Sequence, residues 1–150
     1  MGAFTKNTDE LETPPWLFLQ LMDVFQFNYD ACASEENHLC VEYGTEARSC
    51  LDADWVNVTW LNPPYSNPGP FLQKAWRETY AGVTTVALVK GDPSTKWWVA
   101  HVRDKAMIHW IPNRIKFYLN CKPTEHTASF PSALLIYWGI TWRPDALEIT

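Results

Sequence analysis

Two adjacent prolines end the clearest strand pattern in the chain and restrict what can follow it. Val58-Thr59-Trp60-Leu61 is β-branched and aromatic, which is typical of a β-strand, and Asn62-Pro63-Pro64-Tyr65 follows it directly. Proline fixes φ and lacks a backbone N–H donor, so the strand cannot continue past this point. The sequence therefore predicts a short buried strand that ends in a stiff turn.

Strand and helix patterns alternate around this turn. Helix patterns cover the residue ranges 14–25, 68–79 and 92–102, and strand patterns cover 27–33, 58–61 and 84–89. Thr13 is the expected cap of the first helix, with Pro14 at its first position. This alternation predicts an α/β sheet with crossover connections.

A run of strand patterns without intervening helices closes the chain. Its members are the residue ranges 107–111, 115–119 and 133–138. Consecutive strands that lack a crossover helix pair antiparallel, so we expect an antiparallel edge on a mostly parallel sheet. The expected organisation is a polar N-terminal arm over residues 1–12 and one α/β domain over residues 13–150.

The composition fits one cytoplasmic domain. With 150 residues and 47% hydrophobic content, the chain can bury a core of its own. The four cysteines form no CxxC pair, which argues against a zinc site, and no metal is expected. No apolar run approaches the roughly 20 residues that a membrane span needs, and no signal peptide is recognised. We therefore expect reduced thiols in a cytoplasmic protein.

The turn Asn62-Pro63-Pro64-Tyr65 carries the residue types that methylation of a planar amine requires. The exocyclic amine of adenine is conjugated with its ring and is a poor nucleophile. Two acceptors on its N–H bonds would localise the lone pair and stabilise the developing positive charge. The Asn62 side-chain oxygen and the Pro63 carbonyl are the candidate acceptors, and Pro64 stiffens the turn. Tyr65 offers a ring on which a flipped base can stack, worth about 1–3 kcal/mol. A plain strand-terminating turn is the alternative interpretation.

Other motifs follow in a fixed order along the chain and make the pattern more specific. They are Thr13-Pro14-Pro15-Trp16-Leu17-Phe18, Tyr29-Asp30-Ala31-Cys32-Ala33-Ser34 with Asn37, the range 51–55, Arg114-Ile115-Lys116-Phe117 and Pro131-Ser132-Ala133. Together with the Asn-Pro-Pro-Tyr turn, they resemble the phage N-6-adenine DNA methyltransferases, the short Dam-like family of bacteriophages and prophages. The resemblance covers residues 13 to about 138.

The resemblance implies a minimal, single-domain Rossmann-like fold that transfers a methyl group from S-adenosylmethionine to N6 of adenine in double-stranded DNA. It implies catalytic roles for Asn62, Pro63, Pro64 and Tyr65. It also implies a set of cofactor-binding residues, namely Thr13, Pro14, Asp30, Ala31, Cys32, Asn37, Asp54 and Asn62. Within that set, the range 30–33 meets the methionine part of the cofactor, Thr13 and Pro14 close over its carboxylate, and Asp54 lies near its adenine.

The chain departs from the larger methyltransferases in three respects. Alanines stand at 31 and 33, where a glycine-rich cofactor loop is usual. The interval from Asp30 to Asn62 is short, so that Glu35, Glu36 and Glu42 are all left as candidates for the acid that contacts the cofactor ribose. There is also no separate target-recognition domain, so any sequence reading must come from loops of the catalytic domain.

The charge distribution neither demands nor excludes DNA binding. The net charge is −5, but the range 1–70 holds only Lys6 and Arg48 as basic residues, whereas most Lys and Arg lie in 71–122. A positive face can therefore still form. The candidate DNA contacts are Lys96, Arg114, Lys116 and Lys122, and an ordinary solvated loop is the alternative for each of them.

Two other functions remain open on the sequence alone. The Asn-Pro-Pro-Tyr pattern also suits methyltransferases that act on RNA bases or on a protein glutamine, since each presents an sp2 nitrogen. A non-catalytic nucleic-acid-binding relative would keep the fold but lose the tetrapeptide, which is intact here. We therefore expect an adenine-specific DNA methyltransferase encoded by a phage and acting in the host cytoplasm.

Overall fold

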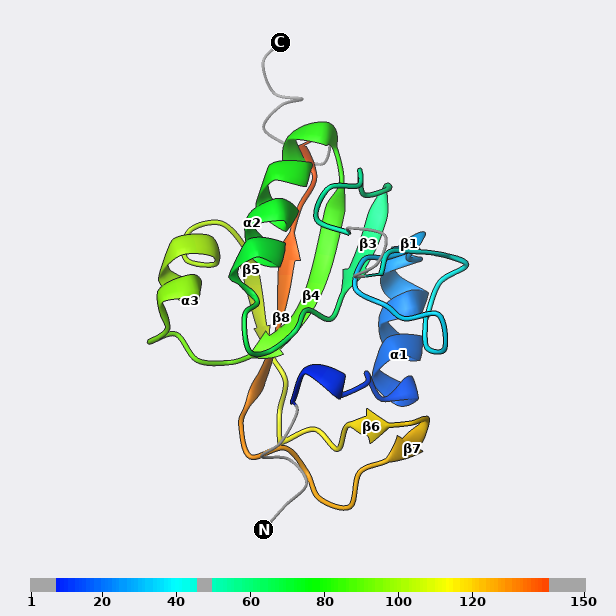
Figure 1. Cartoon of the computed structure of the whole chain (residues 1–150). Coiled ribbons are helices and arrows are strands. Elements are labelled where there is room, and N and C mark those ends of the chain that lie inside the picture. The colour runs from blue at the N-terminus through cyan, green and yellow to red at the C-terminus, as the bar shows by residue number, and fades with distance from the viewer. Residues whose placement is uncertain (1–7, 46–49, 141–150) are drawn as a thin grey trace.

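The computed structural model describes residues 8–45 and 50–140, which form a sheet covered by helices on both faces (Figure 1). The strands of the main sheet are β1 (Tyr29–Asp30), β2 (Glu42–Tyr43), β3 (Val58–Leu61), β4 (Thr84–Lys90), β5 (Met107–Trp110) and β8 (Ser132–Tyr137). The helices are α1 (Pro15–Phe25), α2 (Gly69–Glu78) and α3 (Lys96–His101), with short 3-10 turns η2 (Thr8–Glu10) and η3 (Thr79–Ala81). Strands β6 (Tyr118–Leu119) and β7 (Lys122–Pro123) form a separate hairpin. Residues 1–7 of the expected arm and 141–150 of the expected domain lie outside the described residues.

The main sheet has the order β2-β1-β3-β4-β8-β5. The pairs β2–β1, β1–β3 and β3–β4 are parallel, whereas β4–β8 and β8–β5 are antiparallel. The prediction of an α/β fold with a mostly parallel sheet is therefore confirmed. The antiparallel pairs lie together at one edge of the sheet, as expected. The reversed strand β8 is not the outermost strand, because β5 pairs along its other side.

The predicted strand at 115–119 does not join the main sheet. Only Tyr118 and Leu119 are in strand conformation, and they pair with Lys122–Pro123. The segment instead bonds to the chain that returns from the hairpin, since the Ile115 carbonyl accepts from Ala128 N at 2.7 Å. This local pairing uses the backbone groups that a sheet strand would offer to β5 or β8.

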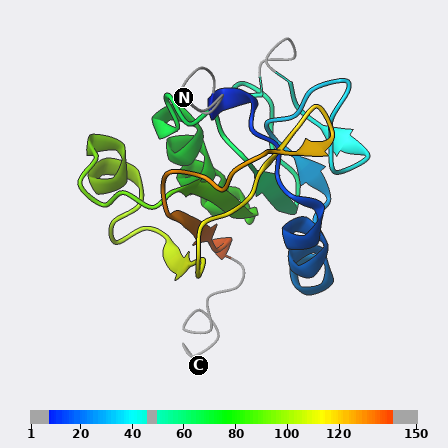
Figure 2. The same cartoon turned by 90° about the horizontal axis from the view of Figure 1, so that it is seen from below.

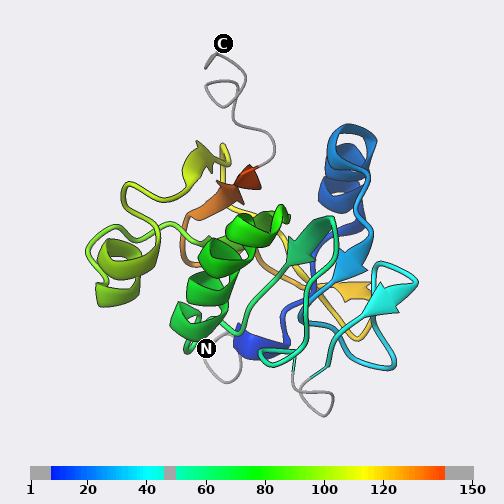
Figure 3. The same cartoon turned by 90° about the horizontal axis from the view of Figure 1, so that it is seen from above.

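Alternating side chains of the central strands supply two cores, one on each face of the sheet. Trp60, Val86 and Leu134 point to the face that α1 covers, while their neighbours Leu61 and Ala87 point to the other face. Seen from above, α1 and α2 lie on opposite sides of the sheet (Figure 3). Strands buried on both faces read as continuous apolar runs, which is why β4 and β8 are evident in the sequence.

The first helix begins one residue later than the sequence predicts. Pro14 is its N-cap and Pro15 its first residue, and no side chain caps its amides. Thr13 is therefore not the cap, and its side chain is buried. The second proline explains the shift, because a residue that precedes proline is disfavoured in the helical region, and Pro14 before Pro15 is accordingly extended with ψ 136°.

The carboxyl ends of β1, β3 and β4 meet at one edge of the sheet, which is the lower edge in Figure 1. Two segments far apart in sequence lie across this edge, namely the N-terminal segment (residues 8–12) and the β6–β7 hairpin (Figure 2). In the ranges 8–45 and 50–140, no helix has the length and apolar character that a membrane crossing requires.

Candidate active site

A cavity of about 530 Å³ opens at this edge of the sheet, a size typical of small-molecule sites. Three parts of the chain form it: the N-terminal segment with Thr13, the ends of β1 and β3 with the loop after β1, and the tip of the hairpin. The lining residues are Asp9, Glu10, Leu11, Glu12, Thr13, Asp30, Cys32, Ala33, Ser34, Glu36, Asn37, Leu39, Trp60, Asn62, Leu119, Asn120 and Cys121.

Asp30 is the buried carboxylate of this cavity. It ends β1, is 3% exposed, and its Oδ2 accepts from Leu39 N at 2.9 Å. Burial raises the pKa of Asp30 to about 6, while the backbone amides of Leu39 and Cys32 and the nearby His38 pull it down. Asp30 is therefore mostly ionised at neutral pH, with backbone donors fixing its orientation.

The turn after Asp30 is tight although it contains alanines. Ala31 is fully buried, and its amide donates to the Trp60 carbonyl at 2.9 Å. The close approach is made possible by Gly44 after β2, because a Cβ there would lie 2.9 Å from the Ala31 carbonyl oxygen. The sequence has no glycine at 31 or 33, and the close approach of the two backbones instead depends on Gly44, directly after the neighbouring strand β2.

Asn62 follows β3, and the nitrogen and the oxygen of its side-chain amide differ in their hydrogen bonding. Its Nδ2 donates to the Leu11 carbonyl at 3.2 Å. Its Oδ1 is buried and has no hydrogen-bond partner among the described residues. A carbonyl can only accept, so the contact with Leu11 fixes which end of the amide is oxygen. An unused buried acceptor costs about 1–3 kcal/mol, which marks Oδ1 as an atom held for a partner.

The rest of the Asn-Pro-Pro-Tyr turn lies beside the cavity and does not line it. Pro63 is buried and Pro64 half-buried. The Tyr65 ring is 7% exposed and makes edge contacts with Phe117 and Phe130 at centroid distances of 6.0 and 5.7 Å. Burial raises the pKa of the Tyr65 hydroxyl, which has no partner within the described parts of the chain.

The structure gathers most, but not all, of the residues predicted to bind a cofactor. Thr13, Asp30, Cys32, Asn37 and Asn62 line the cavity. Pro14 and Ala31 are buried behind it, while Asp54 is exposed on the loop before β3 and does not reach it.

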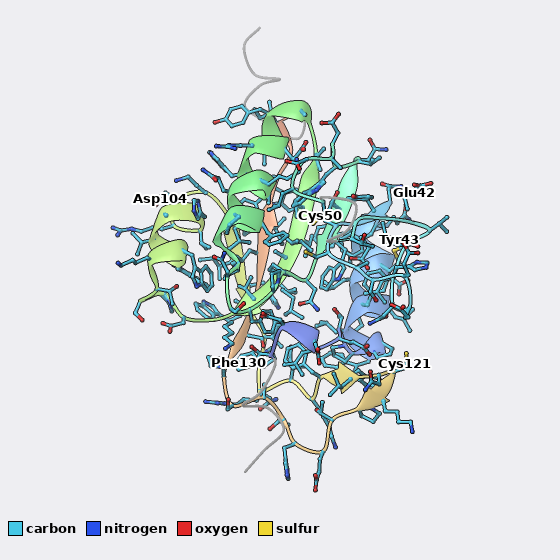
Figure 4. The ribbon with its side chains drawn as sticks, viewed as in Figure 1. Glu42, Tyr43, Cys50, Asp104, Cys121 and Phe130 are labelled. Carbon is cyan, nitrogen blue, oxygen red and sulfur yellow. The ribbon has the colours of Figure 1, made fainter. Side chains whose placement is uncertain are left out.

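Among the three acids left open for the ribose, Glu36 alone lines the cavity. Glu35 accepts from the Tyr43 hydroxyl at 2.6 Å, and Glu42 is exposed on β2. In the side-chain view, Glu42 and Tyr43 both lie above the hairpin tip at Cys121 (Figure 4).

Two parts of the site were not predicted from the sequence. The N-terminal segment supplies Asp9, Glu10, Leu11 and Glu12, and the hairpin tip supplies the range 119–121. Figure 4 shows the tip at Cys121 next to the N-terminal segment, and Glu12 Oε1 accepts from Cys121 N at 2.9 Å. The apolar Leu11 within an otherwise polar stretch was the available signal, since its side chain is buried in the core.

The predicted DNA contacts are all exposed at the same edge of the sheet. Lys96 begins α3, which follows the carboxyl end of β4. Arg114 and Lys116 lie between β5 and the hairpin, and Lys122 is on β7. Nearby, Lys90 Nζ lies 4.8 Å from the Phe130 ring centroid.

No group of three or more His, Cys, Asp or Glu side chains that could hold a metal ion occurs in the described part of the chain.

Comparisons with known proteins agree on one family. Residues 3–149 match the family model described as DNA N-6-adenine-methyltransferase (Dam). The chain is 36% identical over 129 residues to the DNA N-6-adenine-methyltransferase of Haemophilus phage HP1 (strain HP1c1), a match that covers 82% of this chain and 75% of that protein. It is 35% identical over 88 residues to the DNA N-6-adenine-methyltransferase of Escherichia phage T1, which covers 57% of this chain and 37% of that protein.

Proposed function

Because the chain belongs to the DNA N-6-adenine-methyltransferase (Dam) family, and is thus an adenine-specific DNA methyltransferase, we propose how its site performs the reaction. The enzyme transfers the methyl group of S-adenosylmethionine to N6 of an adenine flipped out of double-stranded DNA. The amine is held at the Asn-Pro-Pro-Tyr turn, and the cofactor lies in the cavity beside it.

The observation that carries this proposal is the unpartnered Oδ1 of Asn62. The N6 amine offers two N–H donors and must develop positive charge as it attacks the methyl group. An acceptor that is already oriented, and that does not need to break another hydrogen bond, stabilises that charge at little reorganisation cost. The Pro63 carbonyl is the second acceptor of the proposal, and its position is fixed by the proline ring and by Pro64.

The charge of the cavity supports S-adenosylmethionine as the cofactor. Among the described lining residues there is no Lys, Arg or His, whereas Asp30 and several glutamates are present. S-adenosylmethionine carries a sulfonium and an ammonium group, and its activated methyl group is the chemistry that it supplies. Asp30, Thr13, Cys32 and Asn37 are the residues that would hold it. Pro14 and Ala31 support these residues from behind, and Asp54 is left out.

The fold and the basic loops support the same proposal. Ligands of open α/β sheets bind beyond the carboxyl ends of the parallel strands, and both Asp30 and Asn62 stand at such ends. We accordingly interpret the sheet as a minimal Rossmann-like methyltransferase fold. Lys96, Arg114, Lys116 and Lys122 would contact DNA phosphates, and Tyr65 would contribute its ring to the pocket of the flipped base.

The test is transfer of radiolabelled methyl from S-adenosylmethionine to unmethylated duplex DNA, followed by nucleoside analysis. Label is expected in N6-methyl-2′-deoxyadenosine, and it should increase when the target adenine is mismatched, because unpairing makes flipping easier. Label in RNA or in protein glutamine, with none in DNA, would replace the substrate part of the proposal. Cofactor binding without transfer to any of the three would favour a non-catalytic relative.

A further inference from the structure

The N-terminal segment contacts both sides of the candidate site. On one side it bonds to the residues that begin and follow the Asn-Pro-Pro-Tyr turn, Asn62 and Ser66. On the other side, Glu12 pairs with Tyr118 of the hairpin through two backbone hydrogen bonds of 2.8 and 3.0 Å. The segment is also anchored between these contacts, because Leu11 is buried in the core together with Tyr65.

Asp9 makes the contact that ends the turn. Its Oδ1 accepts from Ser66 N at 2.7 Å, and its Oδ2 accepts from Ser66 Oγ at 2.5 Å. Both donors belong to the residue directly after Tyr65, and a carboxylate acceptor makes such hydrogen bonds stronger than neutral ones. Asp92 also accepts from the amide and the hydroxyl of one serine, Ser94, but both donors reach its Oδ1 and the contact stays within one local turn. Asp9 and Ser66 lie 57 residues apart, so their contact joins two separate segments.

The Asn-Pro-Pro-Tyr turn is thus held at both ends by the same short segment. Leu11 fixes the amide of Asn62 at the first end, and Asp9 fixes Ser66 at the second. The two prolines between them leave little freedom in the backbone. A shift of the segment would therefore move the Asn62 amide and rotate the unpartnered Oδ1 away from its position.

We propose that Asp9 is a positioning residue for methyl transfer. By holding Ser66, it keeps the Leu11 carbonyl in place to accept from the Asn62 amide, and so fixes the orientation of that amide. This inference rests on the proposed role of Asn62. It assigns to the N-terminal segment a part in the chemical step, beyond the closing of the cavity. Asp9 itself is exposed and contacts no reacting atom, so its substitution should cost little stability.

The variants Asp9→Ala and Asp9→Asn separate positioning from a general structural role. Asparagine can still accept from Ser66 N with its oxygen and donate to Ser66 Oγ with its amide nitrogen. Asp9→Ala should lower kcat about 10- to 100-fold, since small misplacements of a catalytic group have effects of this size. The dissociation constant for S-adenosylmethionine and the thermal midpoint should stay close to wild type, and Asp9→Asn should recover most of kcat. Asp23→Ala, an exposed aspartate on α1, is the matched control.

A second readout does not depend on activity. In ¹⁵N-labelled protein, the side-chain amide signals of Asn62 should shift in Asp9→Ala and return in Asp9→Asn, with Ser66→Ala giving an intermediate shift. Unchanged Asn62 signals in Asp9→Ala, a kcat equal to wild type, or equal losses of kcat and cofactor affinity would each overturn the inference. If the wild type transfers no methyl to DNA, the proposed function fails, while the Asn62 signals still decide the role of Asp9.

Discussion

The candidate site has two halves, the end of β1 with Asp30 and the end of β3 with Asn62 and Tyr65, and the polar atoms of the two halves differ in their hydrogen bonding. At the end of β1, the Asp30 carboxylate accepts backbone hydrogen bonds and keeps an elevated pKa. At the end of β3, Trp60 Nε1, Asn62 Oδ1 and the Tyr65 hydroxyl are buried without partners among residues 8–45 and 50–140. At the end of β1 the polar atoms are thus already bonded in the free protein, whereas at the end of β3 they keep bonding capacity for groups that arrive during the reaction.

The largest expected effect comes from removing the unpartnered acceptor. Asn62→Ala should lower kcat by about 100- to 1000-fold or more, the range seen when one preorganised group is lost from a transition-state site. Affinity for S-adenosylmethionine should change only about threefold, because the lost bond forms in the transition state. Single-turnover rates and calorimetric titration of the same preparation measure the two quantities. If Asn62→Ala mainly lowered the affinity for S-adenosylmethionine and left kcat nearly unchanged, Asn62 would bind the cofactor as Asp30 does, and the two ends of the site would not differ in role.

Asp30→Asn should affect the same two quantities in the opposite way, with a large change in cofactor affinity and a small change in kcat. We expect cofactor affinity to fall about 10- to 100-fold at neutral pH, the value of a hydrogen bond to a charged group, while kcat at saturating cofactor stays within about threefold. In the wild type, cofactor affinity should fall as pH drops below about 6, where Asp30 takes up a proton. Calorimetric titration from pH 5 to 8 checks this. A pH dependence that persists in Asp30→Asn would assign it to another group.

The same pKa of Asp30 predicts how stability depends on pH. Burial raises the pKa of Asp30 from 3.8 to about 6, so the protonated form stabilises the fold below pH 3.8, and this contribution is lost as pH rises through about 6. The loss amounts to about 3 kcal/mol at most. Urea unfolding of the wild type and of Asp30→Asn isolates it, because the other carboxylates titrate in both proteins. A constant difference between them across pH 4 to 7 would contradict the shifted pKa.

A smaller effect is expected at the basic loop between β5 and the hairpin. Lys116→Ala should reduce the slope of log affinity for DNA against log salt by about 1, because one phosphate contact and its released counterions are lost. Cofactor affinity should not change, since the lysine is exposed outside the cavity. Fluorescence anisotropy with labelled duplex at several salt concentrations measures the slope, and Arg77→Ala on α2 serves as the control. An unaltered slope would remove Lys116 from the DNA surface.

The difference between the two halves also explains how much of the site could be predicted. Strand β3, the Asn-Pro-Pro-Tyr turn and strand β4 follow from local patterns, because β-branched runs and prolines act over a few residues. Local chemistry was thus sufficient wherever one segment determines its own structure.

Contacts between segments far apart in the chain have no local sequence pattern that would predict them. Strand β2 has only two residues, too few for any periodicity, and its pairing depends on the close approach at Gly44. The contact between Asp9 and Ser66 joins two exposed polar residues, each of which is ordinary on its own. The sequence therefore predicted only a polar arm for this segment, although residues 9–12 line the cavity.

Tyr65→Phe gives the smallest expected effect on activity, and it tests whether the Tyr65 hydroxyl belongs with Asn62 Oδ1 among the atoms that the substrate uses. The sequence predicted an available ring face, but the ring is buried against Phe117 and Phe130, and its hydroxyl has no partner in the described structure. If the ring alone serves the base pocket, Tyr65→Phe should keep kcat within about twofold and raise stability by about 1 kcal/mol, because it removes an unsatisfied buried group. Tyr65→Ala should destabilise the protein by about 3–5 kcal/mol and lower activity further, through the lost ring. Turnover and urea unfolding of both variants measure this. If Tyr65→Phe lost as much activity as Tyr65→Ala, the hydroxyl would join Asn62 Oδ1 as an atom reserved for the substrate.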